Sequence, residues 1–312
     1  MENKKIIVQI SEGIGNQLFM YAHAYALSKK LKRDLYIDNV SAYRKSKNLL
    51  RNHQKYILNN FKIENNLINN DIIINFFFSD LLKKILLFID KFKIKKKFLV
   101  ELKQKKNGIK IIETQTFLDF SKVSDKIYVI GNFEDPTYFQ EYKSKFNQIF
   151  QLKNNYLKKN FYLMKQLKES NSISIHLRRN RFSDQTNLTD NVFYTQKSDD
   201  FTNDCIDYIN KSIIYFRNKI DNPKFFIWSN DFNNIEKFTN KLIISDFSYI
   251  RTDDSLSDFY LFSFSKHFIV SPSSFHWWGA WLNENPKKIC LRPSKLNPSN
   301  NINFWPQEWI SI

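Results

Sequence analysis

The stretch Lys5–Asp38, with the sequence KIIVQISEGIGNQLFMYAHAYALSKKLKRDLYID, predicts the architecture of the chain. Lys5–Ile10 is mostly apolar and predicts a buried strand, and Leu35–Asp38 predicts a second one. Between them, apolar residues recur with the period of an amphipathic helix, at Leu18, Tyr21, Ala22, Tyr25 and Ala26. A strand, a helix and a strand in this order indicate parallel pairing, because the helix carries the chain back to the edge where the first strand began.

The same alternation of strands and helices continues to the end of the chain. Strands are predicted over 126–133, 173–177, 224–228, 268–270 and 288–291, and helices from 135 and over 155–168, 202–219, 233–242, 255–266 and 275–282. A polar break at Ser170–Ser172 predicts a boundary between two α/β domains, residues 1–169 and 170–312. We expect two doubly wound, Rossmann-like domains that face one another across a cleft. The first carries a lysine-rich insertion at about 41–110, where helices are predicted.

Composition and charge narrow the class of protein. The chain has 312 residues, of which 42% are hydrophobic and 25% charged, the proportions of a folded globular protein. Its net charge of +17 favours anionic partners such as nucleic acid, an acidic membrane surface or phosphorylated small molecules. Two cysteines are too few for a disulfide framework. No secretory signal is recognisable and the most apolar later run, 72–89, contains charged residues, so a cytoplasmic or peripheral protein is expected.

A glycine-containing loop joins the first strand to the first helix. Gly13 and Gly15 allow a ligand to approach the backbone, and Asn16 and Gln17 supply amide donors. The loop lacks the third glycine of a dinucleotide fingerprint and the Lys-Ser/Thr of a P-loop, which excludes both. It therefore predicts either a ligand-binding loop of another kind or a plain tight turn.

Polar residues on the strand 173–177 predict an anion site. His176 and Arg178 share one face of this strand, and Arg179 follows directly. Arginine binds phosphate through two parallel hydrogen bonds and stays charged at any working pH. The alternative is structural: the arginine pair caps neighbouring carbonyls or pairs with Asp184.

Two further strand ends carry candidate ligand-binding residues. Ser273 and Ser274 stand at the start of a predicted helix, whose free N–H groups and positive dipole end suit a phosphate. Asp231 follows the strand 224–228, where its carboxylate could contact a base or a ribose. N-capping is the alternative in both cases, and we interpret the tryptophans of 277–281 as core. The segment 255–258 has the pattern of a capping box, which starts the helix 255–266.

The sequence offers no metal-binding motif. Asp-x-Asp, a histidine pair at i, i+4 and a Cys/His cluster are all missing from the chain. We therefore predict chemistry without a metal or another cofactor, in which arginine and a helix N-terminus stabilise a leaving phosphate.

Together these segments resemble glycosyltransferase family 11, the α-1,2-fucosyltransferases, over nearly the whole chain. Gly13–Phe19 is similar to the family's G-x-G-N-Q-x-F, Gly131–Phe133 to its middle motif and His176–Arg179 to its H-x-R-R. Ser229–Asp231 is similar to S-D-D, and Ser273–Asn283 to S-S-F-S-W-W-G-A-W-L-N. The resemblance implies a GT-B fold and inverting, metal-independent transfer of fucose from GDP-fucose to a galactoside hydroxyl, in surface glycan synthesis.

The resemblance also implies roles for individual residues. Arg178 would neutralise the departing β-phosphate with His176 and Ser274 beside it, and Arg179 would hold the strand end. Asp231 would contact the nucleoside, and Asn16 would lie near the reacting centre. The remaining residues expected to bind substrate are Gly13, Gly15, Gln17, Asp184 and Ser273.

Some positions depart from the family's pattern. Arg181 stands where the family has a carboxylate, and either Asp184 replaces that carboxylate or the donor preference changes. Pro272 and His276 stand where the family has Asn and Ser.

The excess of positive charge leaves a second hypothesis open. A module that binds nucleic acid or an anionic membrane, without glycosyl transfer, would use the basic segment 83–110. No nucleic-acid-binding motif accompanies this charge, so we do not expect nucleic acid to be the main partner. The same segment could instead dock an enzyme at the inner face of the membrane, where lipid-linked glycan acceptors are assembled.

Overall fold

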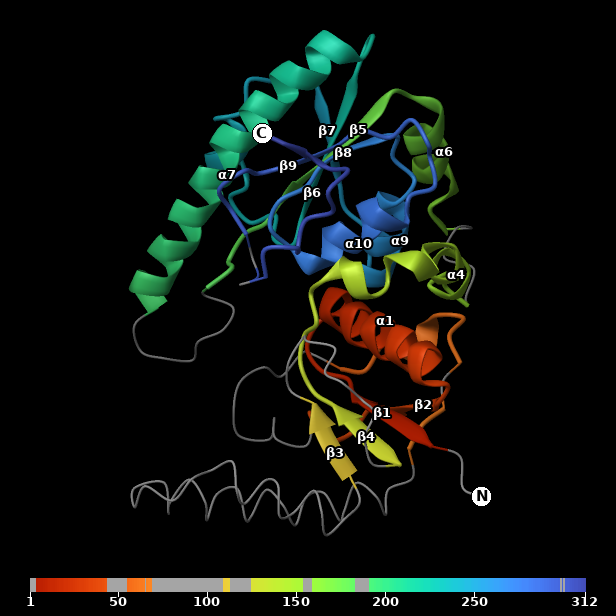
Figure 1. Ribbon diagram of the computed structural model, residues 1–312. Helices are drawn as coiled ribbons and strands as arrows, with labels where there is room; N and C mark the ends of the chain where they lie inside the picture. The colour runs from red at the N-terminus through yellow and green to blue at the C-terminus, as the bar shows by residue number, and fades with distance from the viewer. Residues whose placement is uncertain are drawn as a thin grey trace. The chain divides into compact units, whose positions relative to one another are not determined.

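The computed structural model describes residues 4–43, 55–64, 66–68, 109–112, 125–153, 159–182, 191–297, 299 and 301–312 (Figure 1). The chain divides into two compact units. The first comprises residues 1–59 and 63–142, and the second comprises residues 60–62 and 143–312. Most of the lysine-rich insertion, including nearly all of 83–110, lies outside the described residues.

The first unit contains a four-stranded parallel sheet in the order β2-β1-β4-β3. Its elements are β1 (Lys5–Gln9), α1 (Ile14–Leu31), β2 (Asp34–Asp38), β3 (Ile109–Ile112) and β4 (Lys126–Val129), with short 3-10 helices at Leu58–Asn60, Pro136–Tyr138 and Gln140–Tyr142. Lys5 of β1 pairs with Asp34 of β2 on one side and with Lys126 of β4 on the other. The predicted strand–helix–strand unit is therefore confirmed. β3, which was not predicted, begins at the end of the segment 41–110 where helices were predicted.

The second unit is built on a six-stranded parallel sheet in the order β10-β9-β8-β5-β6-β7. The strands are β5 (Ser172–Leu177), β6 (Lys224–Ser229), β7 (Phe247–Ile250), β8 (His267–Ile269), β9 (Cys290–Arg292) and β10 (Ile310–Ser311). From β5 the chain moves outward through β6 to β7, and then returns to place β8, β9 and β10 on the other side of β5. This is the doubly wound order, and its direction reverses between β5 and β8.

The helices of the second unit are α4 (Lys143–Ile149), α6 (Phe161–Glu169), α7 (Asn191–Lys219), α8 (Glu236–Thr239), α9 (Ser255–Phe262) and α10 (Ser274–Leu282). Figure 1 shows the long α7 running along one side of the sheet. Within the ranges that the structure describes, no helix is long and apolar enough to span a membrane.

The second unit begins earlier than the boundary at residue 170 that we expected from the sequence. Phe146 of α4 packs on Trp281 of α10 with 6.5 Å between ring centroids, and Phe150 lies edge-on to Trp278 at 5.4 Å. These aromatic contacts attach α4 to the second unit, although α4 precedes the first strand of that unit in the sequence.

The tryptophans of α10 form the core that we predicted. Trp277, Trp278 and Trp281 are almost fully buried and pack on one another. Gly279 allows α10 to lie close to α9, because a Cβ at this position would stand 2.8 Å from Cδ1 of Phe262. The tight packing fixes the start of α10 beside the ends of the strands.

Candidate functional site

A cavity of about 390 Å³ opens at the carboxyl ends of the strands of the second unit. It is lined by residues from the ends of β5 and β6, the loop before α9 and the start of α10, namely His176, Arg178, Trp228, Ser229, Asn230, Thr252, Asp253, Asp254, Ser255, Asp258, Ser273, Phe275 and His276. Parallel α/β sheets bind ligands at this edge, at the point where the strand order reverses. The fold brings three of the predicted site residues to this cavity, namely His176, Arg178 and Ser273.

The start of α10 is fixed against the end of β5. Ser271, which follows β8, donates a hydrogen bond from its hydroxyl to the carbonyl oxygen of His176. Ser273 is the N-cap residue of α10, but its side chain makes no capping hydrogen bond. Ser273 lines the cavity, and the side-chain cap that was the structural alternative is not formed, so its hydroxyl and the first N–H groups of α10 can serve an anion.

Two histidines form the floor of the cavity. The rings of His176 and His276 are stacked, with centroids 3.5 Å apart and an interplanar angle of 22°. They are buried, with exposed fractions of 1% and 6%. Burial lowers the pKa of both imidazoles well below the usual value, and the positive charge of Arg178 lowers each further. Both rings are therefore neutral at pH 7.

Asp258 is a cavity residue that we did not assign from the sequence. The capping-box interpretation was wrong, because Asp254 is the N-cap and accepts hydrogen bonds from the N–H groups of Leu256 and Ser257, each at 2.9 Å. The carboxylate of Asp258 instead accepts from the hydroxyl of Thr252 at 2.9 Å. Burial raises the pKa of Asp258 to about 6. The presence of Asp258 in the resembling segment was the only signal that could have pointed to it.

Arg179 is buried behind the cavity and does not line it. Its backbone N–H donates to Oδ1 of Asn230 at 2.8 Å, and its guanidinium donates to the carbonyl oxygens of Asp231 and Asn233. The guanidinium also stacks over the ring of Phe238 at 4.8 Å. Arg179 thus joins the end of β5 to the loop after β6.

Asp231, which was expected to contact the nucleoside, does not line the cavity. Its carboxylate accepts from the N–H of Asn233 at 2.9 Å and from the amide of Asn180 at 2.7 Å, and lies 3.6 Å from the guanidinium of Arg179. The structure favours the alternative in which Asp231 organises this loop. Its neighbours Ser229 and Asn230 are the residues that reach the cavity.

Arg181 connects the end of β5 to the loop before α10. Its guanidinium donates to the carbonyl oxygen of Pro272 at 2.8 Å and stacks over Phe201 at 5.0 Å. The cation that replaces the family's carboxylate therefore holds the loop that carries Ser273. Asp184, the proposed substitute for that carboxylate, lies outside the described residues.

In the first unit, the predicted glycine loop is held by internal hydrogen bonds. The side-chain amide of Gln17 donates to the carbonyl oxygens of Glu12 and Lys55, both at 2.8 Å, and accepts from the N–H of Ile57 at 3.1 Å. The amide of Asn16 donates to the carboxylate of Glu12. Gly13 is the N-cap of α1 and Gly15 is buried in its first turn. Gln17 therefore fastens the loop, and Asn16 faces a carboxylate at the end of β1.

A family model for Glycosyl transferase family 11 matches residues 5–312. The chain belongs to this family. It is therefore a glycosyltransferase, and a module that only binds nucleic acid or membrane is set aside. An alpha-1,2-colitosyltransferase from Escherichia coli is 26% identical to it over 320 residues, covering 98% of each chain. The O-antigen biosynthesis glycosyltransferase WbnK, also from Escherichia coli, is 25% identical over 317 residues, covering 97% of this chain and 99% of the other.

Solved structures share the fold of the glycosyltransferase. The fucosyltransferase NodZ from Bradyrhizobium aligns with a TM-score of 0.52 at 12% sequence identity, covering 89% of this chain and 92% of that chain. NodZ soaked with GDP-fucose aligns with a TM-score of 0.51 at 13% identity. The two parallel-sheet units are thus those of the GT-B fold, as the resemblance implied.

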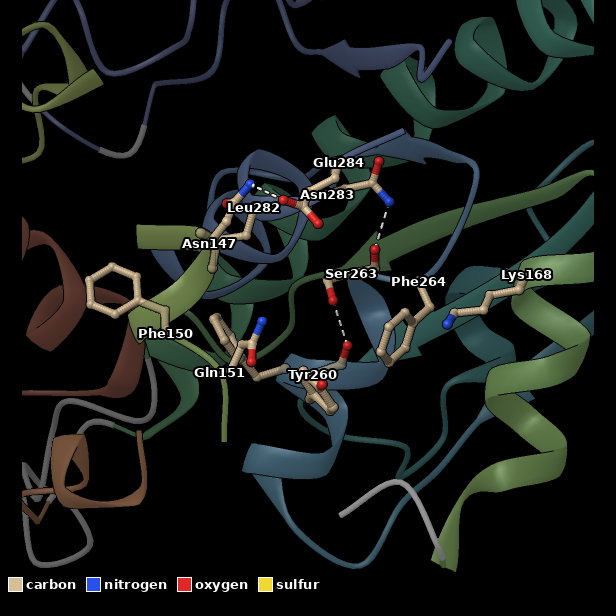
Figure 2. A pocket seen from close by; sticks show the side chains of 11 residues that line it. Asn147, Phe150, Gln151, Lys168, Tyr260, Ser263, Phe264, Leu282, Asn283 and Glu284 are labelled. Atoms are coloured by element: carbon tan, nitrogen blue, oxygen red, sulfur yellow. Dashed lines mark hydrogen bonds between the residues drawn. The ribbon is translucent and has the colours of Figure 1, made fainter. Parts of the chain in front are cut away.

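A second cavity of the glycosyltransferase, of about 300 Å³, lies between α4, α6, α9 and the end of α10 (Figure 2). Its polar groups bond to one another: the amide of Asn147 donates to Glu284 at 2.9 Å, and Asn283 donates to the carbonyl oxygen of Ser263 at 2.6 Å. Figure 2 shows these pairs along its wall. The first cavity, with its neutral histidines and its arginine, is the better candidate for chemistry. No group of three or more metal-ligating side chains is found among the described residues.

Proposed function

We propose that this family 11 glycosyltransferase transfers fucose from GDP-fucose to a galactoside hydroxyl, in α-1,2 linkage and with inversion at the anomeric carbon. The observation that carries the proposal is the juxtaposition of Arg178 with the start of α10 in the cavity at the ends of β5 and β6. A guanidinium and a row of backbone N–H groups are the two protein groups best suited to a diphosphate.

The cavity offers a distinct place for each part of the nucleotide. The diphosphate would bind between Arg178 and Ser273, beside the positive end of α10, whose first residue, Ser274, does not itself line the cavity. The guanine would bind toward Asp258 and Asn230, because a carboxylate and an amide oxygen can accept hydrogen bonds from its N–H groups. Asp231 is retained only as the residue that positions Asn230 through Arg179.

This arrangement supplies the main requirement of the reaction. When the bond between the anomeric carbon and the phosphate oxygen breaks, negative charge develops on the β-phosphate. In this proposal Arg178 and the N–H groups of α10 bind this charge, and groups held in place before the reaction stabilise a transition state strongly. The acceptor oxygen bonds to the anomeric carbon from the face opposite the leaving GDP, so the new linkage has inverted configuration. The proton of the acceptor hydroxyl passes to solvent.

We assign the acceptor side to the first unit. Gly13, Gly15 and Asn16 follow β1, at the edge of a parallel sheet where ligands bind. Asn16 already orients the carboxylate of Glu12, so a hydroxyl of the acceptor would meet an amide and a carboxylate there. Gln17 supports this loop without a free polar atom for substrate.

The acceptor is proposed to be a glycan of the cell surface that is built on a lipid. The O-antigen relative supports this class of acceptor. The net charge of +17 would hold the enzyme at the anionic inner face of a membrane. Co-sedimentation with anionic vesicles at low salt, compared with neutral vesicles, tests this part independently of catalysis.

The test of the function is a panel of donors and acceptors. The full chain is incubated with GDP-fucose, GDP-colitose or GDP-mannose and with free or lipid-linked galactosides, with and without a chelator. We expect transfer of fucose that the chelator does not reduce. Preference for GDP-colitose would instead assign transfer of colitose, the sugar in the name of the Escherichia coli relative. Absence of both transfer and GDP binding would overturn the proposal.

A further inference from the structure

His276 is the cavity residue whose polar atoms are least satisfied. Its ring lies 3.5 Å from that of His176 and is enclosed on its other sides by Phe262 and Phe275, with centroids at 4.5 and 4.7 Å. Both ring nitrogens of His276 are buried and lack a hydrogen-bond partner in the described part of the chain. A neutral imidazole carries one N–H donor, and a buried donor without an acceptor is unfavourable. A ligand that supplies an acceptor would satisfy it.

The charged groups around His276 indicate which class of ligand would supply that acceptor. Arg178 follows β5 and disfavours a second positive charge on either imidazole. The negative groups that line the same cavity are Asp258 of α9, which is bonded to Thr252, and Asp253 and Asp254 of the preceding loop. The ring of His276 belongs to the first turn of α10, where the helix dipole also favours anions. Arg178 and the start of α10 are therefore the groups of this cavity that favour an anion, whereas its carboxylates come from α9 and the loop before it.

We propose that His276 takes up a proton when the diphosphate of the nucleotide sugar enters the cavity, and donates a hydrogen bond to it. The proposal rests on the proposed function, because it requires the donor in this cavity. Only one ring of the stack can be charged, since two imidazolium ions at 3.5 Å would repel each other. Serine, which we expected at this position from the resemblance, cannot take up a proton, so the coupling depends on His276 itself.

Proton uptake makes donor affinity depend on pH. If the complex binds one more proton than the free protein and donor, the affinity rises by up to about tenfold for each pH unit that the pH falls. The effect is confined to pH values between the low pKa of the free pair and the higher pKa in the complex. Protonation of Asp258 near pH 6 has the opposite effect on donor affinity. It removes an acceptor for guanine, so the affinity falls as the pH falls. The window to examine therefore lies above about pH 6.5.

The experiment is calorimetric titration of the full chain with GDP-fucose at about pH 6.5 and about pH 8, in two buffers of different ionisation enthalpy. GDP-fucose is chosen because both of its phosphates are esterified and do not titrate in this range, unlike the terminal phosphate of GDP. We expect at least about fivefold tighter binding at the lower pH and net uptake of a fraction of a proton approaching one.

Two substitutions separate proton uptake from packing. His276→Ser and His276→Gln both remove the titrating ring, and glutamine keeps an N–H donor and more of the volume. We expect both to bind GDP-fucose with an affinity that is independent of pH, and glutamine to remain closer to wild type at pH 8. If the melting temperature shows that the His276→Ser protein does not fold, the His276→Gln protein alone decides the result. Asp258→Asn, the matched control for the other titrating group of the cavity, lowers affinity at both pH values and keeps the dependence on pH.

The outcomes distinguish the two proposals. The role of His276 is overturned if the affinity of the wild-type chain for GDP-fucose does not change with pH. It is also overturned if both His276 variants keep the wild-type dependence of affinity on pH. Either result leaves the proposed function intact. An absence of any binding of GDP-fucose and GDP by the wild-type chain overturns the proposed function itself.

Discussion

The end of β1 in the first unit and the end of β5 in the second are built alike but are satisfied differently. Each is a buried parallel strand followed by a polar loop and part of a motif that marks the family. In the first unit the amide of Gln17 is bonded at both of its polar atoms. In the second unit His276 has no hydrogen-bond partner within the described residues, and Ser273 does not cap its helix. The comparison separates a polar residue that holds a loop from polar residues that await a ligand.

The largest effect is expected from the cavity in the second unit. Arg178→Ala removes the guanidinium that we assign to the leaving diphosphate, so turnover of GDP-fucose should fall by about a thousandfold with little change in the melting temperature. Product formation and circular dichroism check both parts. Arg178→Lys keeps the charge without the planar fork and should recover only part of the rate. Turnover like that of wild type in Arg178→Ala would remove Arg178 from the mechanism.

The opposite pattern is expected for the loop of the first unit. Gln17→Ala leaves the N–H of Ile57 and the carbonyl oxygens of Glu12 and Lys55 without this partner, so the free energy of unfolding should fall by about 1–3 kcal/mol. Urea unfolding measures this loss, and the affinity of the folded fraction for GDP should remain that of wild type. A stable Gln17→Ala protein that has lost activity would show that Gln17 binds substrate instead.

The charged carboxylate of Asp258 should lower the stability of the fold, whereas we propose that it contributes to donor binding. Its pKa rises from 3.8 to about 6 on folding, so the folded state binds the proton more tightly and stability is lost as the pH rises through 6. Asp258→Asn should therefore stabilise the protein by about 1–3 kcal/mol at pH 8 and have little effect at pH 4. Melting temperatures at the two pH values measure the difference. Equal stabilisation at both pH values would show that the charge is not the cause.

The smallest effect is expected behind the cavity. In Gly279→Ala the new Cβ would stand 2.8 Å from Phe262, which packs on His276, so either α9 or α10 must shift. We expect a loss of about 1–2 kcal/mol in stability, although alanine is the better helix former. Thermal unfolding measures it. A rise in melting temperature would show that the contact between α9 and α10 is loose.

Much of this fold can be predicted from the sequence because its strands are short apolar runs that alternate with helices. β3, β7 and β10 were not predicted. They are edge strands of their sheets, and β7 is only partly buried and β10 exposed, so they lack the continuous apolar run of a central strand. The attachment of α4 to the second unit depends on the packing of Phe146 against Trp281, which no local pattern reveals.

The site could be predicted only in part for a similar reason. His176, Arg178 and Ser273 could be predicted from the sequence, because polar residues at strand ends and helix starts stand out in an otherwise apolar pattern. The cavity position of Asp258 depends on which aspartate caps α9, and Asp254 takes that role. The stack of His176 on His276 depends on how α10 lies against β5. Asp231 and Arg179 were expected to bind substrate. In the structure the guanidinium of Arg179 instead bonds to the carbonyl oxygen of Asp231 and pairs with its carboxylate, which joins the loops after β5 and β6.

Titration of the full chain with GDP at neutral pH, in parallel with Arg178→Ala, tests most directly whether the cavity at the ends of β5 and β6 holds a nucleoside diphosphate. We predict a dissociation constant in the micromolar range for wild type, about −6 to −8 kcal/mol, and a loss of at least about a hundredfold in the variant. An absence of binding at millimolar GDP, or equal affinity in the two proteins, would contradict this account.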